Sequence, residues 1–491
     1  MVFLPLVGAL VILGFVNGTQ RIRMVSAAVA LGDLALAILA FVRFDANSSD
    51  RFQLIDRFEW ISNVTFNAQY QMAIDGLSAP LVLLTGILGF CAVLASWSVK
   101  NRLKEYFVWL LVLQTAVMGV FVSMDFLLFF VFWELELIPM YFLISIWGSG
   151  RRHYSAMKFL LFTFLGSAFM LVGIIALFLA DNVGHTDMIR WSEEGTSAVM
   201  TIVPLTVVFW FFFIAFAVKL PLLPFHTWLP DAHTDAPTAV SVMLAGVLLK
   251  MGGYGLLRIT VGMFPHKAME YAPELMLLAV VTILYAAIVT VRQTDLKRLI
   301  AYSSISHMGL VLLGIGSIGF VGGGFATVGL TGASMQLFTH GTITGLLFLG
   351  VGLIYDRTHT RYIPDLGGLI QRMPFVAISF IIAGLASLGL PGLSGFVSEI
   401  LVFFGGFKAY PVGTAFGAFG IVLTAGYILW MIERVLFGTP RRHFIQISDS
   451  NMIEAIPLIL LIISIVIVGV YPSLLTDVFS AGIEPIADMM S

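Results

Sequence analysis

The sequence has little charge and almost no cysteine. Charged residues make up 11% of its 491 positions and hydrophobic residues 59%, with a mean hydropathy of +0.99. This composition excludes a water-soluble globular protein and is typical of a chain that crosses a membrane many times. The single cysteine, Cys91, excludes an internal disulfide and a cluster held by several thiolates, and we expect it to be a small core residue.

Other binding signals are also missing. The net charge of −2 gives no electrostatic reason to bind nucleic acid. No glycine-rich phosphate loop follows a strand pattern, so a nucleotide site is not expected. The largest segment outside the membrane, residues 43–73, is mixed and β-capable but too short for a catalytic domain. The N-terminus lacks the basic region of a cleaved signal peptide, which predicts a retained first helix.

Long apolar runs dominate the chain and predict an all-α integral membrane protein with about 14 spans. These are 2–16, 22–42, 74–96, 106–123, 125–147, 157–180, 201–229, 238–262, 273–291, 296–318, 326–354, 374–407, 411–437 and 454–472. Spans 7, 11 and 12 exceed the roughly 20 residues needed to cross, so we expect breaks or tilts there. With the N-terminus outside, the cytoplasmic loops carry 17 of the 26 basic residues, which supports this orientation.

Ionisable side chains interrupt six of these spans near mid-depth. They are Glu134, Lys219, Lys250, His307, His340 and Glu399. A charge at the bilayer centre costs about 2.5–3.5 kcal/mol on insertion scales. We therefore interpret the six residues as a polar path through the membrane. The alternative is a structural role at helix contacts, which carries most weight for the two histidines.

Span 5 carries a second carboxylate beside Glu134. Glu136 is two residues further on and points to a different face, so the two cannot form a carboxylate pair, and we expect Glu136 to be structural. Pro139 removes the hydrogen bond to the carbonyl of Leu135 and predicts a kink.

Span 7 is interrupted immediately after Lys219. Pro221 and Pro224 free the carbonyls of Ala217 and Leu220. In transporters, interrupted helices mark the ion site. A buried lysine readily exchanges a proton, and an anionic Glu134 nearby would favour its charged form. A lysine that only caps loose carbonyls is the alternative.

The segment that follows looks superficially like a metal site, with His226, Asp231, His233 and Asp235. The seven-residue spacing between its histidines runs across prolines and matches no standard zinc pattern. We expect a polar cytoplasmic opening or a domain contact here instead.

The remaining ionisable residues lie in polar or closely packed surroundings. Small residues beside Lys250, including Gly252 and Gly253, favour close helix packing, so this lysine is expected to face the bundle. His307 follows the hydroxyl-rich run 302–306, which suits a hydrated proton wire.

Two similar breaks suggest internal symmetry. LPLLPF at 220–225 interrupts span 7, and LPGLSGF at 390–396, with Pro391 and Gly392, interrupts span 12. If spans 4–8 and 9–13 form two units, their odd number of helices makes the units inverted repeats. The predicted divisions are 1–105 (spans 1–3 and an extracytoplasmic loop), 106–262 (first repeat), 273–437 (second repeat) and 438–491 (span 14 and a short tail).

Four motifs resemble the antiporter-like membrane subunits of NADH:quinone oxidoreductase, respiratory complex I. They are FFVFWELELIPMYFLISIWG, AFAVKLPLLPFHTWLPDAHTDAPTAVSVMLAGVLLKMGGYGLLR, AYSSISHMGLVLLG and LPGLSGFVSE. The resemblance implies fourteen helices with inverted repeats and proton translocation through Glu134, Lys219, Lys250, His307 and His340. It implies no cofactor in this chain: flavin, iron–sulfur clusters and quinone are expected in partner subunits, with homologous antiporter-like subunits on either side.

Two features favour the M type (chain 4) of this subunit. Glu399 stands where the L and N types usually carry lysine, and the chain ends about 19 residues after its last span, without a long lateral helix. The leading hypothesis is a redox-driven proton-pump module in a bacterial cell membrane. The alternatives are a subunit of a multisubunit sodium/proton antiporter, and an assembly scaffold whose polar residues only fix packing.

Overall fold

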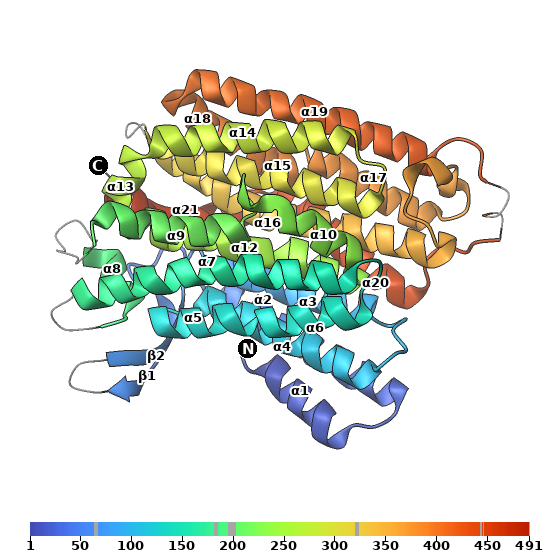
Figure 1. The fold of residues 1–491 in the computed structure, drawn as a ribbon, viewed down its shortest axis with the longest axis horizontal. Helices are drawn as coiled ribbons and strands as arrows, with labels where there is room; N and C mark the ends of the chain where they lie inside the picture. Colours follow the sequence, from blue (N-terminus) through green and yellow to red (C-terminus); the bar gives the residue numbers. More distant parts are fainter. Residues whose placement is uncertain are drawn as a thin grey trace.

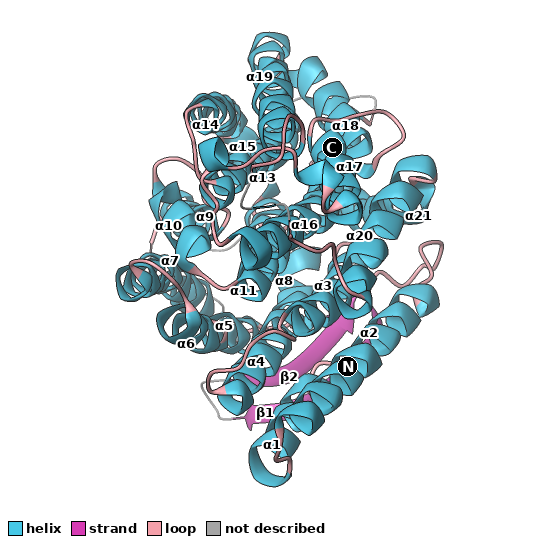
Figure 2. Ribbon diagram, turned by 90° about the vertical axis from the view of Figure 1, so that its right-hand side faces the viewer, coloured by secondary structure: helices cyan, strands magenta, loops and turns pink. Residues whose placement is uncertain are grey.

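The computed structural model describes residues 1–62, 67–180, 185–194, 203–319, 324–441, 444 and 446–490. It is a bundle of helices with a small two-stranded sheet at one end. The helices run along the long axis of the molecule in Figure 1, and Figure 2 looks onto their ends.

The elements of the first half are α1 (Leu4–Phe15), α2 (Thr19–Arg43), β1 (Gln53–Ser62), β2 (Asn67–Ile74), α3 (Ala79–Ala95), α4 (Leu103–Val122), α5 (Phe126–Leu135), α6 (Leu137–Trp147), α7 (Arg152–Ala180), α8 (Met188–Glu194), α9 (Leu205–Lys219), the 3-10 turn η1 (Phe225–Thr227), α10 (Trp228–Asp235), α11 (Thr238–Met243), the π-helix η2 (Leu244–Leu248), α12 (Leu249–Gly255) and the π-helix η3 (Leu256–Val261).

The second half contains α13 (Pro265–Glu270), α14 (Ala272–Val291), α15 (Leu296–Gly316), η4 (Ser317–Gly319), α16 (Phe325–Thr358), η5 (Ile363–Asp365), η6 (Leu369–Gln371), α17 (Pro374–Ser387), α18 (Ser394–Ala409), α19 (Pro411–Leu436), α20 (Met452–Val470) and α21 (Ser473–Asp488).

The predicted spans agree with these helices. Among the described residues, ten helices are long and apolar enough to cross a membrane, and four more, α1, α3, α9 and α17, are apolar but shorter. The all-α, multi-pass membrane class is therefore confirmed. The count of fourteen crossings stays a prediction, because the four shorter helices fall below the roughly 20 residues that span a bilayer. The four predicted divisions of the chain also stay predictions.

Burial separates inner helices from outer ones. The most apolar 18-residue window of Thr238–Val261 is 100% buried, and that of Phe325–Thr358 is 94% buried, against 28% for Thr19–Arg43. Figure 2 places α16 near the middle of the bundle, with α19 and α14 toward one edge and α1 and α2 toward the opposite edge. Lys250, His307 and His340 thus lie on inner helices. Cys91 is fully buried in α3, as predicted.

Loops that follow odd-numbered spans meet at one end of the bundle. Trp147 Nε1 donates to the carbonyl of Asn101 at 2.7 Å, and the Ser149 amide donates to the carbonyl of Asp235 at 2.7 Å. At the other end, β1 and β2 form an antiparallel hairpin within the β-capable segment 43–73. This separation agrees with the predicted alternation of the loops, while the assignment of the cytoplasmic side stays a prediction.

The C-terminal tail is more ordered than expected. The short tail predicted after span 14 contains a further helix, α21, which packs along α16 with Thr331 Oγ1 and Ser480 Oγ 3.3 Å apart. In span 11, where we expected a break or a tilt, α16 runs as one unbroken helix of 34 residues.

A buried ion pair joins the end of span 8 to the start of α3. Arg258 donates from Nη1 to Asp75 Oδ2 at 2.7 Å and from Nη2 to Asp75 Oδ1. Asp75 also accepts from the Ser78 amide at 3.0 Å, and Arg258 Nε donates to the Tyr254 hydroxyl at 3.1 Å. The exposed fractions of the two charged side chains are 1% and 0%. Removal of one partner would leave an uncompensated buried charge.

We expect Asp75→Ala to lower the free energy of unfolding by about 3–5 kcal/mol, since Arg258 would lose its counter-ion in a water-free site. Detergent-solubilised protein titrated with denaturant measures this. Glu270→Ala is the matched control, because it breaks the more exposed Lys267–Glu270 pair, which is worth about 1 kcal/mol or less. Equal losses in the two variants would contradict the anchoring role of Asp75.

Candidate functional site

The two carboxylates of span 5 lie on either side of a kink. α5 ends at Leu135 and α6 begins at Leu137, so the kink predicted from Pro139 is confirmed. Glu136 is fully buried at this junction. Glu134 is only partly buried and borders an apolar hollow lined by side chains of α5, α6 and α7. The two side chains therefore meet different surroundings, as the sequence predicts.

The break in span 7 follows Lys219. α9 ends at this residue and helical structure resumes at Phe225, which confirms the break predicted from Pro221 and Pro224. The carbonyl of Ala217 accepts from the Leu222 amide at 2.9 Å, and the carbonyl of Val218 accepts from Trp228 Nε1 at 3.0 Å. The Ala217 carbonyl, one of the two that the prolines were predicted to free, is therefore satisfied without the lysine. The interpretation of Lys219 as a mere cap for loose carbonyls therefore loses support.

The Lys219 ammonium forms an ion pair with Glu136 Oε1. The exposed fractions of the two side chains are 1% and 0%. The ring centres of Trp133 and Phe159 lie 5.4 and 5.6 Å from Nζ, a distance at which aromatic faces attract a cation. The direct contact is thus made by Glu136, the carboxylate that we expected to be structural, and the expected interaction of Lys219 with Glu134 stays a prediction.

Lys250 sits on a short α-helical stretch between two π-helices. η2 precedes α12 and η3 follows it, and π-helical turns frequently mark functional sites. Lys250 Nζ donates to the carbonyl of Ala245, which lies in η2, and lies 2.8 Å from His340 Nδ1. An ammonium can only donate, so this contact fits a neutral His340 that accepts at Nδ1. The predicted orientation of Lys250 toward the bundle interior is confirmed.

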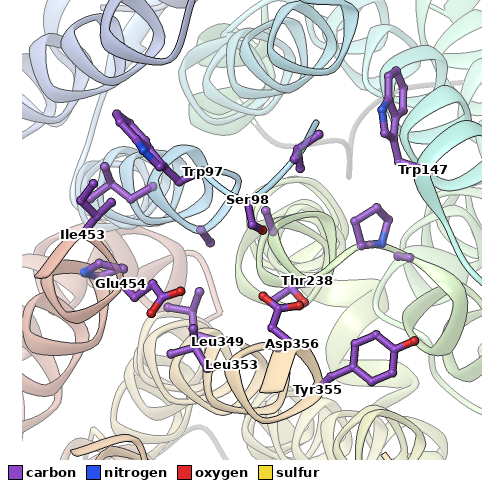
Figure 3. Close-up of a pocket in the computed structure, with 18 of the residues that line it drawn as sticks. Trp97, Ser98, Trp147, Thr238, Leu349, Leu353, Tyr355, Asp356, Ile453 and Glu454 are labelled. Carbon is purple, nitrogen blue, oxygen red and sulfur yellow. The ribbon is translucent and has the colours of Figure 1, made fainter. Parts of the chain in front are cut away.

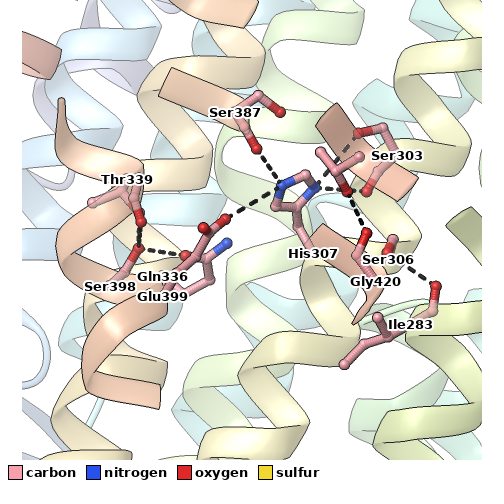
Figure 4. A network of polar contacts seen from close by, with 12 residues as sticks. Ile283, Ser303, Ser306, His307, Gln336, Thr339, Ser387, Ser398, Glu399 and Gly420 are labelled. Atoms are coloured by element: carbon pink, nitrogen blue, oxygen red, sulfur yellow. Dashed lines mark hydrogen bonds and ion pairs between the residues drawn. The ribbon is translucent and has the colours of Figure 1, made fainter. Parts of the chain in front are cut away.

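His307 lies beside the break in span 12. α17 ends at Ser387 and α18 begins at Ser394, so Pro391 and Gly392 fall in a break, as predicted. His307 Nε2 is 2.9 Å from the carbonyl of Ser387, and Nδ1 is 2.8 Å from the carbonyl of Ser303 (Figure 4). Carbonyl oxygens only accept, so a ring nitrogen of His307 that carries a proton can donate it to one of these carbonyls. Glu399 Oε1 lies 3.9 Å from His307 Nε2.

Four of the six predicted residues thus form one buried row. Lys250 contacts His340, the ring centres of His340 and His307 are 5.4 Å apart, and Glu399 follows. Lys219 lies on a neighbouring helix, and the backbone of α9 at Lys219 packs closely against Gly252 of α12. No direct contact joins Lys219 to this row among the described residues, and Glu134 lies furthest toward the protein surface.

A cavity of about 310 Å³ opens where α3, α6 and α16 end and where α11 and α20 begin. Figure 3 shows Thr238, Asp356 and Glu454 among the side chains that surround it. Lys297 also lines it and donates to the carbonyl of Ala236 at 2.6 Å. The cavity lies at the end of the bundle to which we assign the cytoplasmic loops. Lys297 is a candidate that the sequence analysis missed, because the residue lies at a span boundary and counted only as a loop charge.

The side chains of the metal-like segment have separate partners. His226 packs against Tyr285 with ring centres 5.2 Å apart, Asp231 pairs with Lys158 at 2.7 Å, and Asp235 accepts from Ser155 at 2.5 Å. The His233 ring stacks on Phe348, 4.6 Å away. Within the described part of the chain, no group of three or more potential metal ligands converges.

The His233 ring lies in the protein interior without a polar partner among the described residues. It is fully buried, and within the described residues neither ring nitrogen has a hydrogen-bond partner. Its backbone carbonyl accepts from the Ser241 hydroxyl at 3.3 Å, and that hydroxyl lies 3.5 Å from Lys297 Nζ. His233 therefore stands between the cavity and the buried row.

Comparison with known proteins identifies the family. Residues 123–424 match the family model described as NADH:quinone oxidoreductase/Mrp antiporter, transmembrane. The chain is 38% identical to NADH-quinone oxidoreductase subunit M of Rickettsia prowazekii, with 98% of this chain and 97% of the relative aligned. It is 40% identical to NAD(P)H-quinone oxidoreductase chain 4 1 of Synechococcus elongatus, with coverages of 99% and 90%. The chain belongs to this family.

Solved structures agree with the assignment. A chain of respiratory complex I from Thermus thermophilus with bound NADH superposes with a TM-score of 0.89 and 27% identity, covering 100% of this chain and 99% of that one. A chain of the Mrp complex from Dietzia sp. gives a TM-score of 0.86 at 20% identity, with coverages of 99% and 96%, and shows the shared fold. The predicted resemblance to the M type is confirmed. The roles of the individual site residues stay predictions.

Two glycines in the span 12 break offer a matched test of the Glu399 position. Gly389 and Gly392 have φ of +76° and +91°, where an L-residue is strained by about 1–2 kcal/mol. A methyl group on Gly389 would overlap Glu399 Oε2, whereas nothing lies within 4 Å of the same position on Gly392.

Both alanine variants should therefore show a similar loss of stability, but only Gly389→Ala should displace Glu399 from His307. We expect Gly389→Ala to lower proton pumping per quinone reduced by at least half in membrane vesicles, with little change for Gly392→Ala. A matching loss of pumping in both variants would show that general strain, rather than the Glu399 carboxylate, is responsible.

Proposed function

We propose that this chain is the proton-translocating membrane subunit, of the M type, of an NADH:quinone oxidoreductase or a complex with a related electron donor. Its relatives are named as subunits of such enzymes, and the chain aligns with almost their whole length. The observation that carries the proposal is the buried row from Lys250 through His340 and His307 to Glu399. Ionisable groups are otherwise costly inside a membrane and mark ion pathways.

The proposed path starts at the cavity beside Lys297. A proton taken up from the cytoplasmic side would pass Lys297 and His233 and reach Lys250. From Lys250 it would move to His340, then to His307 and Glu399, and leave on the opposite side of the membrane. His340 is suited to this transfer because one ring nitrogen can accept while the other donates.

Lys219 is proposed to couple this path to events elsewhere in the complex. Moving one charge against 100 mV costs about 2.3 kcal/mol. The energy has to come from quinone reduction in partner subunits, so a change of charge must be passed along the membrane domain. The Lys219–Glu136 pair, beside a helix break and packed against the Lys250 helix, is placed to respond to such a change.

The proposal assigns no redox site to this chain. Flavin, iron–sulfur clusters and quinone would be bound by partner subunits, and homologous antiporter-like subunits would flank this one in the membrane. The location would be an energy-transducing membrane, in bacteria the cell membrane, with the N-terminus outside. A sodium/proton antiporter subunit is the alternative, and sodium-dependent transport without quinone reduction would favour it.

We expect Lys219→Ala to abolish most proton pumping per quinone reduced while the complex still assembles, because the coupling charge is lost. Membrane vesicles with a pH-sensitive dye measure the pumping, and native gels measure the assembly. Lys408→Ala serves as a control, since Lys408 lies near the end of α18 away from the row. Unchanged pumping in assembled Lys219→Ala would remove Lys219 from the mechanism.

A further inference from the structure

We propose that Tyr427 of α19 is a positioning residue for the buried row. Through Ser303 it keeps the ring proton of His307 on Nδ1, so that Nε2 is the atom that receives and releases protons. The inference rests on the proposed role of His307 as a member of the row. It assigns a task to a tyrosine that the sequence analysis did not single out, and it gives the hydroxyl-rich run 302–306 a specific partner.

A chain of three hydroxyl groups leads away from the His307 ring. Ser303 Oγ lies 3.5 Å from His307 Nδ1 and 2.9 Å from the Tyr427 hydroxyl. The Tyr427 hydroxyl donates to Thr424 Oγ1 at 3.0 Å, and this group donates in turn to the carbonyl of Gly420 at 3.1 Å. Figure 4 shows Ser303 and Gly420 on this side of the ring. The chain of hydroxyl groups therefore joins α15 to α19.

The last member of the chain fixes the direction of every hydrogen bond in it. The Gly420 carbonyl can only accept, and each hydroxyl group has one hydrogen to donate. Because Thr424 donates its hydrogen to that carbonyl, it accepts from Tyr427. Tyr427 has then used its own hydrogen and accepts from Ser303. The Ser303 hydrogen thus points toward the tyrosine, and the Ser303 oxygen presents lone pairs to His307.

Both groups of Ser303 near Nδ1 therefore act as acceptors. Its carbonyl oxygen lies 2.8 Å from Nδ1, and its hydroxyl oxygen lies 3.5 Å away. A neutral imidazole carries one ring proton, and the surrounding hydrogen bonds determine which nitrogen holds it. Among the described residues, Nε2 has one such acceptor within hydrogen-bond distance, the carbonyl of Ser387 at 2.9 Å. Two acceptors against one favour the proton on Nδ1.

Burial makes this arrangement persistent. The exposed fractions of Ser303, His307, Thr424 and Tyr427 are all 4% or less. Buried polar groups keep protein partners, and a buried group that loses its partner destabilises the structure. For the Ser303 hydroxyl to turn toward Nδ1, it would have to give up its bond to Tyr427. The tyrosine hydroxyl therefore opposes that rotation.

The consequence for proton transfer lies at Nε2. A proton that binds Nε2 makes the ring cationic, and the new N–H group can donate to the carbonyl of Ser387. Glu399 Oε1 lies 3.9 Å from the same nitrogen, within reach through one bridging water. Transfer to this carboxylate breaks the Nε2–H bond and returns the ring to the neutral state, with the Nδ1–H bond unchanged. The His307 ring is then ready for the next proton without a change of tautomer.

The first test measures protons pumped per quinone reduced by the assembled complex in membrane vesicles. Tyr427→Phe removes only the hydroxyl group, so Ser303 can turn its hydrogen to Nδ1 and part of the population holds the ring proton on Nε2. We expect the ratio to fall to about half or less. Tyr70→Phe is the matched control and should pump normally, because this half-buried tyrosine of the hairpin contacts Met72 Sδ, away from the row.

The second test reads the tautomer directly, which a merely structural role would not change. In the reconstituted complex with ¹⁵N-labelled histidine, protonated and bare ring nitrogens give separate NMR signals, and the His307→Gln variant assigns those of His307. We expect neutral His307 to carry its proton on Nδ1. Tyr427→Phe should shift the ratio of the two tautomers by about fivefold, the effect of one neutral hydrogen bond. Thr424→Val, which removes the acceptor of Tyr427, should act in the same direction, and Thr424→Ser should restore the ratio.

The outcomes separate this inference from the proposed function. If His307→Gln pumps normally in an assembled complex, the proposed row fails. If His307→Gln stops pumping while Tyr427→Phe leaves both the pumping and the ring signals unchanged, the inference is wrong and the proposed function stands. If Tyr427→Phe does not assemble, Thr424→Val decides: a shifted tautomer ratio supports the inference, and an unchanged ratio overturns it.

Discussion

The structure depends on the partners of the charged side chains that are buried between helices and have no contact with water. A single charge in an apolar interior is unstable, and a pair or a hydrogen-bonded group can remain. Arg258 binds Asp75, Lys219 binds Glu136, and Lys250 contacts a backbone carbonyl and His340. Each of these contacts joins two segments of the chain. The same contacts that stabilise the bundle therefore determine where protons can reside.

Interrupted helices supply much of this compensation. The break in span 12 exposes the carbonyl of Ser387, which becomes a partner of His307. The π-helical turn before Lys250 includes the carbonyl of Ala245 that the lysine contacts. At the break in span 7, a backbone amide satisfies the carbonyl of Ala217 and a tryptophan that of Val218, and the lysine pairs with a carboxylate. Irregular backbone thus appears where ionisable side chains need partners.

Much of this arrangement could be predicted from the sequence. Apolar run length predicts the spans, prolines predict both breaks and the kink, and mid-span charges identify Lys250, His307, His340 and Glu399 as members of one row. These signals are local in the chain. The π-helical turns could not be predicted, because no proline lies in either of them. α21 was missed because its segment is short and mixed.

Pairings between distant segments were the hardest to predict. The direction of the span 5 kink determines whether Glu134 or Glu136 contacts Lys219, and the sequence does not give that direction. Asp33 and Gln114, 2.6 Å apart in the buried contact between α2 and α4, were missed for a similar reason. Lys297 could have been noticed as a lysine at the boundary of a span that begins with a polar run.

The central claim is that protons cross through the row that begins at Lys250. The most direct measurement is the number of protons taken up per quinone reduced by a reconstituted complex that carries Lys250→Met, compared with the unchanged complex in the same liposomes. The account predicts a lower ratio while the assembled enzyme still reduces quinone, because the row loses its first member. An unchanged ratio in the fully assembled variant would contradict the account and place the proton path elsewhere.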